Sequence, residues 1–381
     1  MRICVAAGTR PEAIKLAPVH KAVQARPGWR SIWIASGQHG EMKDRALVAL
    51  DVVPDVRLEA PEDAGSLAER LAHMIAEYDR ALAALKPDMV LVQGDTSTTI
   101  AAALAAFTRQ IPVGHVEAGL RTFDLGAPFP EEGWRCLVGR LAALHFAPTG
   151  RSAANLRREA IDPARIHITG NTVIDALKSL PAEPGALGLP AEGRRRVVVT
   201  LHRRENWDGG VDRVIAALLA LRDRFADVDV VFVAHANPAL STRVRTRLEG
   251  ERSVTVCDPL DYPEFVALMR TAVLMLSDSG GVQEEAPAFG VPVLVLRDTT
   301  ERAEAIEAGV ARLVGTDTAA IVEAAAHLLS DAEAWNAMAR ASNPFGDGRA
   351  AGKIVDAIAA WARDRGLGRA DPPDAAASVS A

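Results

Sequence analysis

Short apolar runs alternate with longer amphipathic stretches along nearly the whole sequence, and this alternation constrains the fold more than any other feature. Runs such as DMVLVQGD (88–95) and VLMLSD (273–278) are apolar at successive positions, so both faces of a strand formed there would be buried. Burial of both faces is typical of parallel strands that are covered by helices on two sides. Helical patterns, among them residues 66–85 and 211–225, lie between the runs. The alternation therefore predicts an α/β fold with doubly wound sheets.

The chain of 381 residues is too long for one ordinary hydrophobic core, which predicts two domains. A stretch rich in Pro and Gly, KSLPAEPGALGLPAEGRR, separates two sets of strand patterns and places the boundary near residues 170–193. We expect a Rossmann-like domain over residues 1–170, a second one over 171–353, and a disordered tail over 367–381. Ligands bind at the carboxyl ends of strands in such sheets, so the expected site is a cleft between the two domains.

Charge and cysteine content exclude several classes of protein. The formal net charge is −6, from 43 basic and 49 acidic residues, and no basic stretch is long enough to predict nucleic-acid binding. The three cysteines, Cys4, Cys136 and Cys257, lie far apart without the spacing of metal ligands. No apolar run approaches the length of a membrane span, and residues 1–12 lack the apolar core of a signal peptide. We therefore expect a cytoplasmic protein that binds neither nucleic acid nor membrane.

Two motifs follow expected strands in the first half. GTRPEAIK (8–15) places Arg10 and Lys15 beside the free N–H groups of a helix start, an arrangement that binds anions. The alternative is an ordinary strand–helix turn with solvated charges. QGDTSTT (93–99) places Asp95 at a strand end before four hydroxyl residues. The alternative role of Asp95 is helix capping, which needs one such group rather than five.

The segment VEAGLRTFDLGAPFPEEGWR (116–135) is rich in ionisable side chains where an apolar strand ends. Glu117 ends the strand, and Glu131 follows two prolines that stiffen the loop and so help to hold a carboxylate in place. His115 precedes Glu117 by two residues and points to the same face of the strand. The alternative, an acidic surface loop, does not explain Glu117 at the end of an apolar strand.

Two histidines follow expected strands in the second half. In TLHRREN (200–206), two arginines come directly after His202, and this set can neutralise a phosphate. The alternative is a basic turn without a ligand. His235, in VAHANP, also follows a strand, and the pattern there supports a structural and a functional role equally.

The segment LSDSGGVQEEAP (276–287) is the most specific motif of the second half. Small residues let a phosphate approach the backbone there, and Glu285 can accept two hydroxyl bonds from a ribose. The small residues are Ser279, Gly280 and Gly281. Arg312, further along, can add positive charge. A plain Gly-rich turn would leave the glutamates unexplained.

Taken together, the motifs resemble those of the non-hydrolysing UDP-N-acetylglucosamine 2-epimerases. They occur in the family's order over residues 3–348: GTRPEAIK, GDTSTT, GHVEAGLRT, PFPEE, HFAPT, ITGNTVIDAL, HRREN, LSDSGGVQEEAP, RDTTER and NPFGDG. The resemblance implies a glycosyltransferase-B-like fold of two Rossmann-like domains, with a helix over 354–366 packing back on the first. It also implies a homodimer that converts UDP-GlcNAc to UDP-ManNAc without NAD or metal.

The resemblance further implies roles for individual residues. Catalysis is assigned to three carboxylates and a histidine: Asp95, Glu117, Glu131 and His202. The carboxylates would transfer protons and stabilise positive charge at the sugar ring, and which of them is acid and which is base stays open. Substrate binding is assigned to the following residues: Arg10, Lys15, Arg135, His235, Phe265, Ser279, Gly280, Gly281, Glu285 and Arg312. Among these, Phe265 would lie next to uracil. Arg10 and Arg135, together with the catalytic His202, would stabilise charge on the diphosphate.

Four positions depart from the family pattern, and the largest change is Trp134, which stands where the family has a polar amide. A tryptophan beside Glu131 could reshape the sugar pocket, so a related nucleotide sugar stays open as substrate. The other departures are Gly40, Leu201 and Ala303. Gly40 stands where the family has an arginine, near a region at which UDP-GlcNAc also binds as an activator in some bacterial members. The resemblance therefore does not imply this activation for the present chain. The remaining alternatives are a hydrolysing 2-epimerase that releases ManNAc and UDP, a retaining glycosyltransferase, and a non-catalytic nucleotide-sugar sensor.

Overall fold

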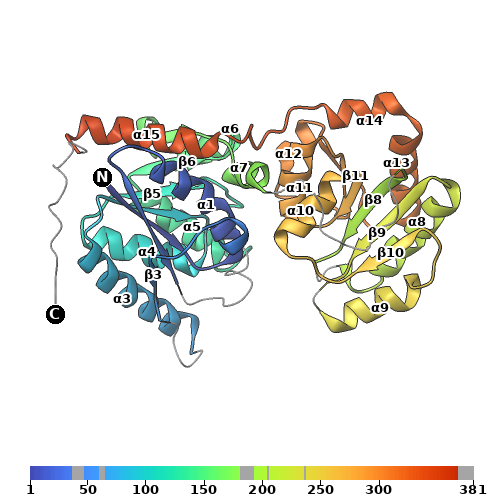
Figure 1. The fold of residues 1–381 in the computed structure, drawn as a ribbon, viewed down its shortest axis with the longest axis horizontal. Helices are drawn as coiled ribbons and strands as arrows, with labels where there is room; N and C mark the ends of the chain where they lie inside the picture. Colours follow the sequence, from blue (N-terminus) through green and yellow to red (C-terminus); the bar gives the residue numbers. More distant parts are fainter. Residues whose placement is uncertain (37–46, 60–64, 181–192, 204–205, 236, 368–381) are drawn as a thin grey trace. The chain divides into compact units, whose positions relative to one another are not determined.

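The computed structural model describes residues 1–36, 47–59, 65–180, 193–203, 206–235 and 237–367. Contacts divide the chain into two compact units (Figure 1). Unit 1 comprises residues 1–176 together with the segment from Gly348 onward, and unit 2 comprises residues 177–347. Within the described ranges each unit contains one parallel sheet, of seven strands in unit 1 and six in unit 2. The predicted α/β fold with two doubly wound sheets is therefore confirmed.

The sheet of unit 1 has the strand order β3-β2-β1-β4-β5-β6-β7. Its strands are β1 (Arg2–Ala7), β2 (Arg30–Ala35), β3 (Val56–Arg57), β4 (Met89–Gln93), β5 (Val113–Val116), β6 (Leu144–Ala147) and β7 (Ile166–Ile168). Its α-helices are α1 (Arg10–Gln24), α3 (Leu67–Leu85), α4 (Ser97–Thr108), α5 (Glu131–Leu141), α6 (Gly150–Arg158), α7 (Thr172–Ser179) and α15 (Ala350–Asp364). The strand order reverses between β1 and β4, and such a switch point is where open α/β sheets bind ligands.

The sheet of unit 2 has the strand order β10-β9-β8-β11-β12-β13. Its strands are β8 (Arg195–Thr200), β9 (Val228–Val233), β10 (Val254–Cys257), β11 (Ala272–Ser277), β12 (Val293–Val295) and β13 (Ala311–Leu313). Its α-helices are α8 (Gly210–Arg224), α9 (Pro238–Leu248), α10 (Tyr262–Arg270), α11 (Gly280–Glu285), α12 (Ala303–Glu307), α13 (Thr318–Ser330) and α14 (Ala332–Ala339). Here the order reverses between β8 and β11, so the motifs that follow these two strands meet at a second switch point.

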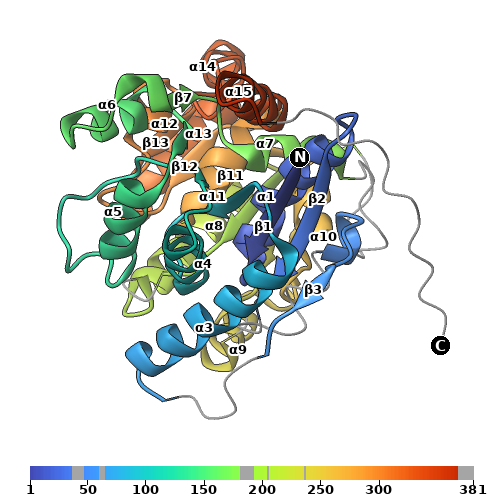
Figure 2. The ribbon, with the colours of Figure 1, turned by 90° about the vertical axis from the view of Figure 1, so that its left-hand side faces the viewer.

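Apolar packing explains why these elements form. Every residue of β4 is buried, as the continuous apolar run predicted. Helix α3 begins after Ser66, whose hydroxyl and the Glu69 carboxylate form a reciprocal capping box. Apolar residues of α3, α4 and α5 pack with β1, β2 and β4 in one core cluster, and Figure 2 shows these helices lying together beside the strands. The helices therefore pack against the strands whose residues are most apolar.

The division into units falls inside α7, six residues beyond the expected end of the first domain at residue 170. Asp175 of α7 explains the difference, because its carboxylate accepts hydrogen bonds from the N–H groups of Ala350 (3.1 Å) and Ala351 (2.9 Å). These groups begin α15, which packs along α1 in unit 1 (Figure 1). Most of the expected linker and tail, 181–192 and 368–381, lies outside the described residues. Among the described residues, no helix is both long and apolar enough to cross a membrane.

Candidate functional site

The switch point of unit 1 is built on a buried glutamate, Glu12 of α1. Its carboxylate accepts hydrogen bonds from Gly8 N (2.9 Å), Thr9 N (2.6 Å) and the Thr96 hydroxyl (2.5 Å). Glu12 thereby joins the turn after β1 to the turn after β4. Burial raises the pKa of Glu12, and the hydrogen bonds oppose that increase. We interpret Glu12 as the structural tie of the two motifs, a role that the sequence pattern did not indicate.

Close packing explains the glycine that follows β1. A Cβ atom on Gly8 would lie 2.0 Å from the Thr98 hydroxyl oxygen and 2.1 Å from that of Ser36. These two hydroxyl groups are hydrogen-bonded to each other at 2.9 Å. Gly8 is therefore needed because the backbone approaches another turn closely, in addition to any need for a tight turn.

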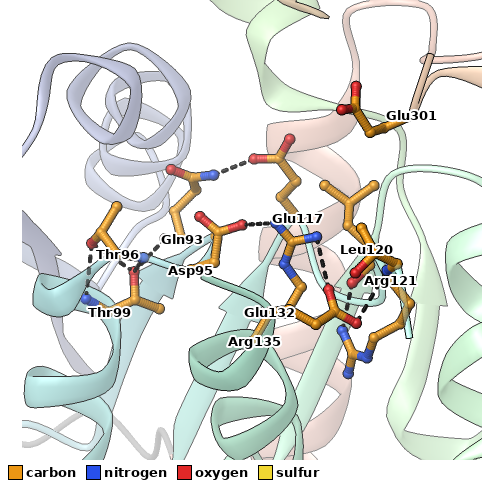
Figure 3. Close-up of polar contacts among 12 residues, drawn as sticks. Gln93, Asp95, Thr96, Thr99, Glu117, Leu120, Arg121, Glu132, Arg135 and Glu301 are labelled. Atoms are coloured by element: carbon orange, nitrogen blue, oxygen red, sulfur yellow. Dashed lines mark hydrogen bonds and ion pairs between the residues drawn. The ribbon is translucent and has the colours of Figure 1, made fainter. Parts of the chain in front are cut away.

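Glu117 lies directly after β5 with a φ of 61°, in the left-handed region that non-glycine residues seldom adopt. Its side chain is buried and forms an ion pair with Lys15, whose Nζ lies 2.6 Å and 2.8 Å from the two carboxylate oxygens. The amides of Gln93 and Asn171 also donate to Glu117, with a distance of 3.3 Å from Asn171 Nδ2. Figure 3 shows Gln93 and Glu117 pointing toward each other. Lys15, expected to bind an anionic ligand, thus contacts a carboxylate of the protein.

Asp95, which follows β4, is close to Glu117 and pairs with the guanidinium of Arg135 from α5 (Figure 3). Burial raises the pKa of Asp95; the charge of Arg135 opposes this increase, and the charge of Glu117 adds to it. The Asp95 side chain retains 24% of its exposure, so a ligand can still reach the carboxyl group. The structure thus brings Asp95, Glu117, Lys15 and Arg135 together at one switch point.

The two consecutive glutamates that begin α5 have different surroundings. Glu132 is fully buried, and its Oε1 accepts hydrogen bonds from Thr122 N (3.1 Å) and Phe123 N (2.9 Å), while its Oε2 lies 3.2 Å from Arg135 Nη1. Glu132 therefore holds the loop before α5. Glu131 is partly exposed, and among the described residues nothing forms a hydrogen bond or ion pair with its carboxylate. It is separated from Arg135 by four residues, so the two share a face of α5.

Two other predictions for unit 1 concern Arg10 and Trp134. Arg10 is exposed at the first position of α1, where its charge faces solvent. Trp134 packs against the core cluster of unit 1, and its buried indole N–H has no hydrogen-bond partner among the described residues. Packing thus accounts for the tryptophan. Gly40, a further departure from the family pattern, lies outside the described residues.

The switch point of unit 2 is built on a second buried carboxylate, that of Asp278 after β11. Its Oδ1 accepts a hydrogen bond from His202 N (2.8 Å), and its Oδ2 accepts from Arg203 N (3.0 Å) and Asn206 Nδ2 (2.8 Å). Asp278 therefore fixes the turn that carries His202, which follows β8. The sequence pattern identified Asp278 only as the end of a strand, because its partners lie more than seventy residues away.

Aromatic side chains gather beside His202. The rings of His202 and His235 meet edge to face with centroids 5.4 Å apart, and Trp207 lies 5.8 Å from His235. The Nδ1 atom of His235 accepts a hydrogen bond from Asn237 N at 2.9 Å. A neutral His235 therefore carries its proton on Nε2 and can donate it to a ligand. The two histidines predicted from sequence are thus brought together.

The turn that begins α11 contains the predicted phosphate-binding residues and a neighbouring arginine that sequence reasoning missed. A Cβ atom on Gly280 would lie 3.2 Å from the guanidinium carbon of Arg302, so this cation lies against the backbone of the turn. Arg302 also forms an ion pair with Glu284 at 2.8 Å. A Cβ atom on Gly281 would lie 3.4 Å from Glu285 Oε1, which places that carboxylate at the same turn. Arg302 is the last residue of the motif RDTTER, which was the one sequence feature that could have indicated it.

Arg312 and Phe265 lie on other elements of unit 2. Arg312 is exposed on the edge strand β13, and β12 separates it from β11 and the Ser279 turn. It lines a separate cavity of about 340 Å³ with Arg297 and Glu323. Phe265 is partly buried on α10, the helix that precedes β11. In the part of the chain that the structure describes, no three His, Cys, Asp or Glu side chains gather so that they could hold a metal ion.

Comparison with known proteins finds similarity to UDP-N-acetylglucosamine 2-epimerases in both sequence and structure. A family profile described as UDP-N-acetylglucosamine 2-epimerase matches residues 21–359. The UDP-N-acetylglucosamine 2-epimerase of Escherichia coli K12 is 44% identical over 94% of this chain and 98% of its own. A crystal structure of the Neisseria meningitidis UDP-GlcNAc 2-epimerase bound to UDP-GlcNAc is 40% identical, with a TM-score of 0.85 over 94% of this chain and 100% of its own. A glycosyltransferase from Rickettsia africae, 14% identical, shares the fold alone, with a TM-score of 0.58 over 93% of each chain.

Proposed function

We propose, because the chain belongs to the UDP-N-acetylglucosamine 2-epimerase family, that it interconverts UDP-GlcNAc and UDP-ManNAc by inverting C2 of the sugar. The observation that most supports this activity is the pair of carboxylates of Asp95 and Glu117 at the switch point of unit 1. Each has its own cationic partner, Arg135 and Lys15 respectively. Two neighbouring carboxyl groups in different electrostatic surroundings suit a reaction in which one proton is removed and another is returned.

The chemistry follows from the weak acidity of C2–H, because no carbonyl group adjoins that carbon. Proton removal becomes feasible if the C1–O bond to UDP breaks as the C2–H electron pair forms the C1=C2 double bond. The products of this step are 2-acetamidoglucal, free UDP and a proton held by the protein. Return of UDP to C1 and of a proton to the opposite face of C2 completes the inversion. The reaction therefore needs proton-transfer groups near C2 and cations near the diphosphate.

In this proposal, unit 1 acts on the sugar. Asp95, Glu117 and Glu131 transfer protons and stabilise positive charge at the ring. Burial raises the pKa of Asp95 against the opposing charge of Arg135, so Asp95 holds a proton more readily than an exposed aspartate does. The carboxylate of Glu131, which forms no hydrogen bond or ion pair with a described residue, is available to the substrate. Arg135 forms an ion pair with Asp95 and stabilises its charged form. The positive charge of the exposed Arg10 stabilises the diphosphate.

Unit 2 binds the UDP group in the same proposal. The backbone of Ser279, Gly280 and Gly281 contacts a phosphate, and Glu285 accepts hydrogen bonds from the ribose hydroxyls. His202 and His235 stabilise charge as the diphosphate departs. We assign the additional phosphate contact to Arg302, because its guanidinium lies against Gly280, in place of Arg312 on the edge strand. Phe265 is assigned to uracil.

The test is incubation of the protein with UDP-GlcNAc in heavy water. We expect deuterium at C2 in both epimers and formation of UDP-ManNAc, with Asp95→Asn and Glu117→Gln as inactive controls. Release of free ManNAc and UDP would instead identify the hydrolysing reaction, and the same assay on related UDP-sugars tests the sugar specificity. Tight binding without exchange at C2 would identify a nucleotide-sugar sensor. Action in the cytoplasm as a homodimer stays a prediction of the family resemblance.

A further inference from the structure

The carboxylate of Glu117 is held by more than an ion pair. Two uncharged amides, those of Gln93 and Asn171, also donate to it, one to each oxygen. Gln93 is the last residue of β4, and Asn171 directly precedes α7. Both side chains are buried, with exposures of 5% and 3%. The proposed proton transfer uses neither amide, although each donates its buried N–H group to the same acidic side chain.

The ion pair by itself does not fix the carboxylate. Lys15 Nζ lies at similar distances, 2.6 Å and 2.8 Å, from the two oxygens, so its charge acts almost equally on both. An ammonium group is a compact charge on a flexible chain, and it imposes little direction. Amide donors are planar and directional, and they add no charge. The two amides can therefore determine which way each oxygen points while Lys15 supplies the charge.

The amide of Asn171 has a defined orientation. Its Oδ1 accepts a hydrogen bond from Val173 N at 3.1 Å, so the Nδ2 group is the one that faces Glu117. The main chain of Gln93 is also held, because its carbonyl oxygen accepts the Thr99 hydroxyl at 2.6 Å. The Asn171 amide and the main chain of Gln93 are thus anchored to different segments of unit 1. Donors anchored in this way can hold the Glu117 carboxylate in one plane.

The backbone of Glu117 needs such support. Its φ of 61° is a strained conformation for a residue with a side chain, and strain of this kind persists only where the surroundings determine the position. Neighbouring main-chain bonds, from Gly94 N to Val116 O (3.1 Å) and from Ala118 N to Phe146 O (3.1 Å), fix the backbone on both sides. The amides complete this constraint at the side chain.

We propose that Gln93 and Asn171 are positioning residues that orient the Glu117 carboxylate for proton transfer at C2. This inference rests on the proposed epimerase function and extends it to two uncharged residues. Each amide stabilises the charged form of Glu117 and restricts its rotation, so loss of either one slows proton transfer and leaves UDP binding in unit 2 intact. Proton transfer depends steeply on the placement of the reacting group.

Two variants test the proposal. Gln93→Met removes a donor at nearly constant volume, and Asn171→Asp keeps the acceptor for Val173 N but replaces the donor with an oxygen. The matched control is Asn155→Ala, which removes an amide that donates to Gly119 O (3.1 Å), two residues beyond Glu117. We expect each test variant to lower kcat about ten- to hundredfold, with KM changed less than about threefold. The acidic limb of the kcat/KM profile should move to higher pH in Gln93→Met, because the charged carboxylate has lost a donor, and further in Asn171→Asp, because the new carboxylate also repels it.

A purely structural role would lower the melting temperature without moving that limb, and this is the result expected for Asn155→Ala. Wild-type kcat and an unmoved acidic limb in both test variants would overturn the proposal. If one of the variants fails to fold, the other decides between these outcomes.

A second readout separates this proposal from the proposed function. The ¹³C signal of the Glu117 carboxyl carbon, assigned with Glu117→Gln, is followed through a pH titration without substrate. We expect the midpoint to lie higher in Gln93→Met than in the wild type. If the wild type shows no exchange at C2 but the midpoint is higher in Gln93→Met, the epimerase proposal is wrong, and the proposal that the two amides hold the Glu117 carboxylate remains. If the enzyme is active and the two proteins have equal midpoints, only the proposal about the amides is overturned.

Discussion

Replacement of Asp278 with asparagine tests whether one buried carboxylate organises the switch point of unit 2. Asp278 is fully buried and accepts three hydrogen bonds, two of them from the main chain of His202 and Arg203. An asparagine can keep a carbonyl oxygen at only one of the two positions. The favourable orientation preserves the two bonds at Oδ2, from Arg203 N and Asn206 Nδ2, and turns the amide NH₂ toward His202 N.

The magnitude follows from this loss. A hydrogen bond to a charged group is worth about 1.5–3 kcal/mol, and a buried N–H left without an acceptor adds a desolvation cost of about 1–3 kcal/mol. Partial relaxation of the turn reduces their sum, so we expect Asp278→Asn to lower the free energy of unfolding by about 2–4 kcal/mol. The turn loses the bond that holds His202 N to residue 278, so UDP affinity and the rate of C2 exchange should also fall, each by about tenfold or more.

Urea denaturation followed by circular dichroism measures the stability, and calorimetry with UDP measures the affinity. Asp229→Asn is the matched control, because Asp229 is also buried in the sheet of unit 2 but pairs with Arg194 Nε (2.7 Å) near the amino end of β9. We expect this control to lose stability and to keep its UDP affinity. If Asp278→Asn unfolds within about 0.5 kcal/mol of the wild type, or binds UDP equally well, the reasoning is refuted.

Three further outcomes are expected. Glu117→Gln should slow exchange at C2 about 10²–10⁴-fold with UDP affinity retained, as measured by deuterium incorporation and calorimetry. Arg302→Ala should weaken UDP binding about ten- to hundredfold, whereas Arg312→Ala should change it less than about twofold; equal effects would contradict the assignment of Arg302 to a phosphate. Burial raises the pKa of Glu301, but hydrogen bonds and charge from Arg297 lower it more strongly, to about 2. The stability that this pair contributes is therefore present above pH 4.5 and lost as the pH falls toward 2, so Glu301→Gln should cost about 0.5–1 kcal/mol at neutral pH and nothing near pH 2. If urea denaturation shows the same loss of unfolding free energy in Glu301→Gln at every pH in this range, the ion pair is not the source of that loss.

Local patterns predicted most of the fold and the location of the motifs. The strand and helix patterns match the observed elements, as in the helix expected at 66–85 and found at Leu67–Leu85. The family resemblance was confirmed by comparison with known proteins. Strand ends were also predictable, because an apolar run stops where the polar motif begins. These features depend on residues that are neighbours in sequence, and short-range patterns record them well.

Contacts between distant residues were not predictable in the same way. The sequence pattern indicated no structural role for Glu12, but its carboxylate joins two turns whose residues are 84 apart in sequence. Lys15 was assigned to a ligand, and it pairs with Glu117, 102 residues away. Arg302 was overlooked, although it lies beside Gly280. In each case the identity of the partner depends on which strands are adjacent in the sheet.

The sequence by itself determined the alternation of strands and helices, the two-domain organisation and the family, because apolar periodicity and motif order are properties of the linear chain. Only the tertiary structure decided that β1 lies beside β4 and β8 beside β11, and therefore which polar side chains share each switch point. Strand pairing is a choice among many non-local arrangements of similar apolar surfaces. The roles of Glu12, Asp278, Gln93 and Asn171 follow from that choice, since a buried polar group is explained only by the partner that the fold brings to it.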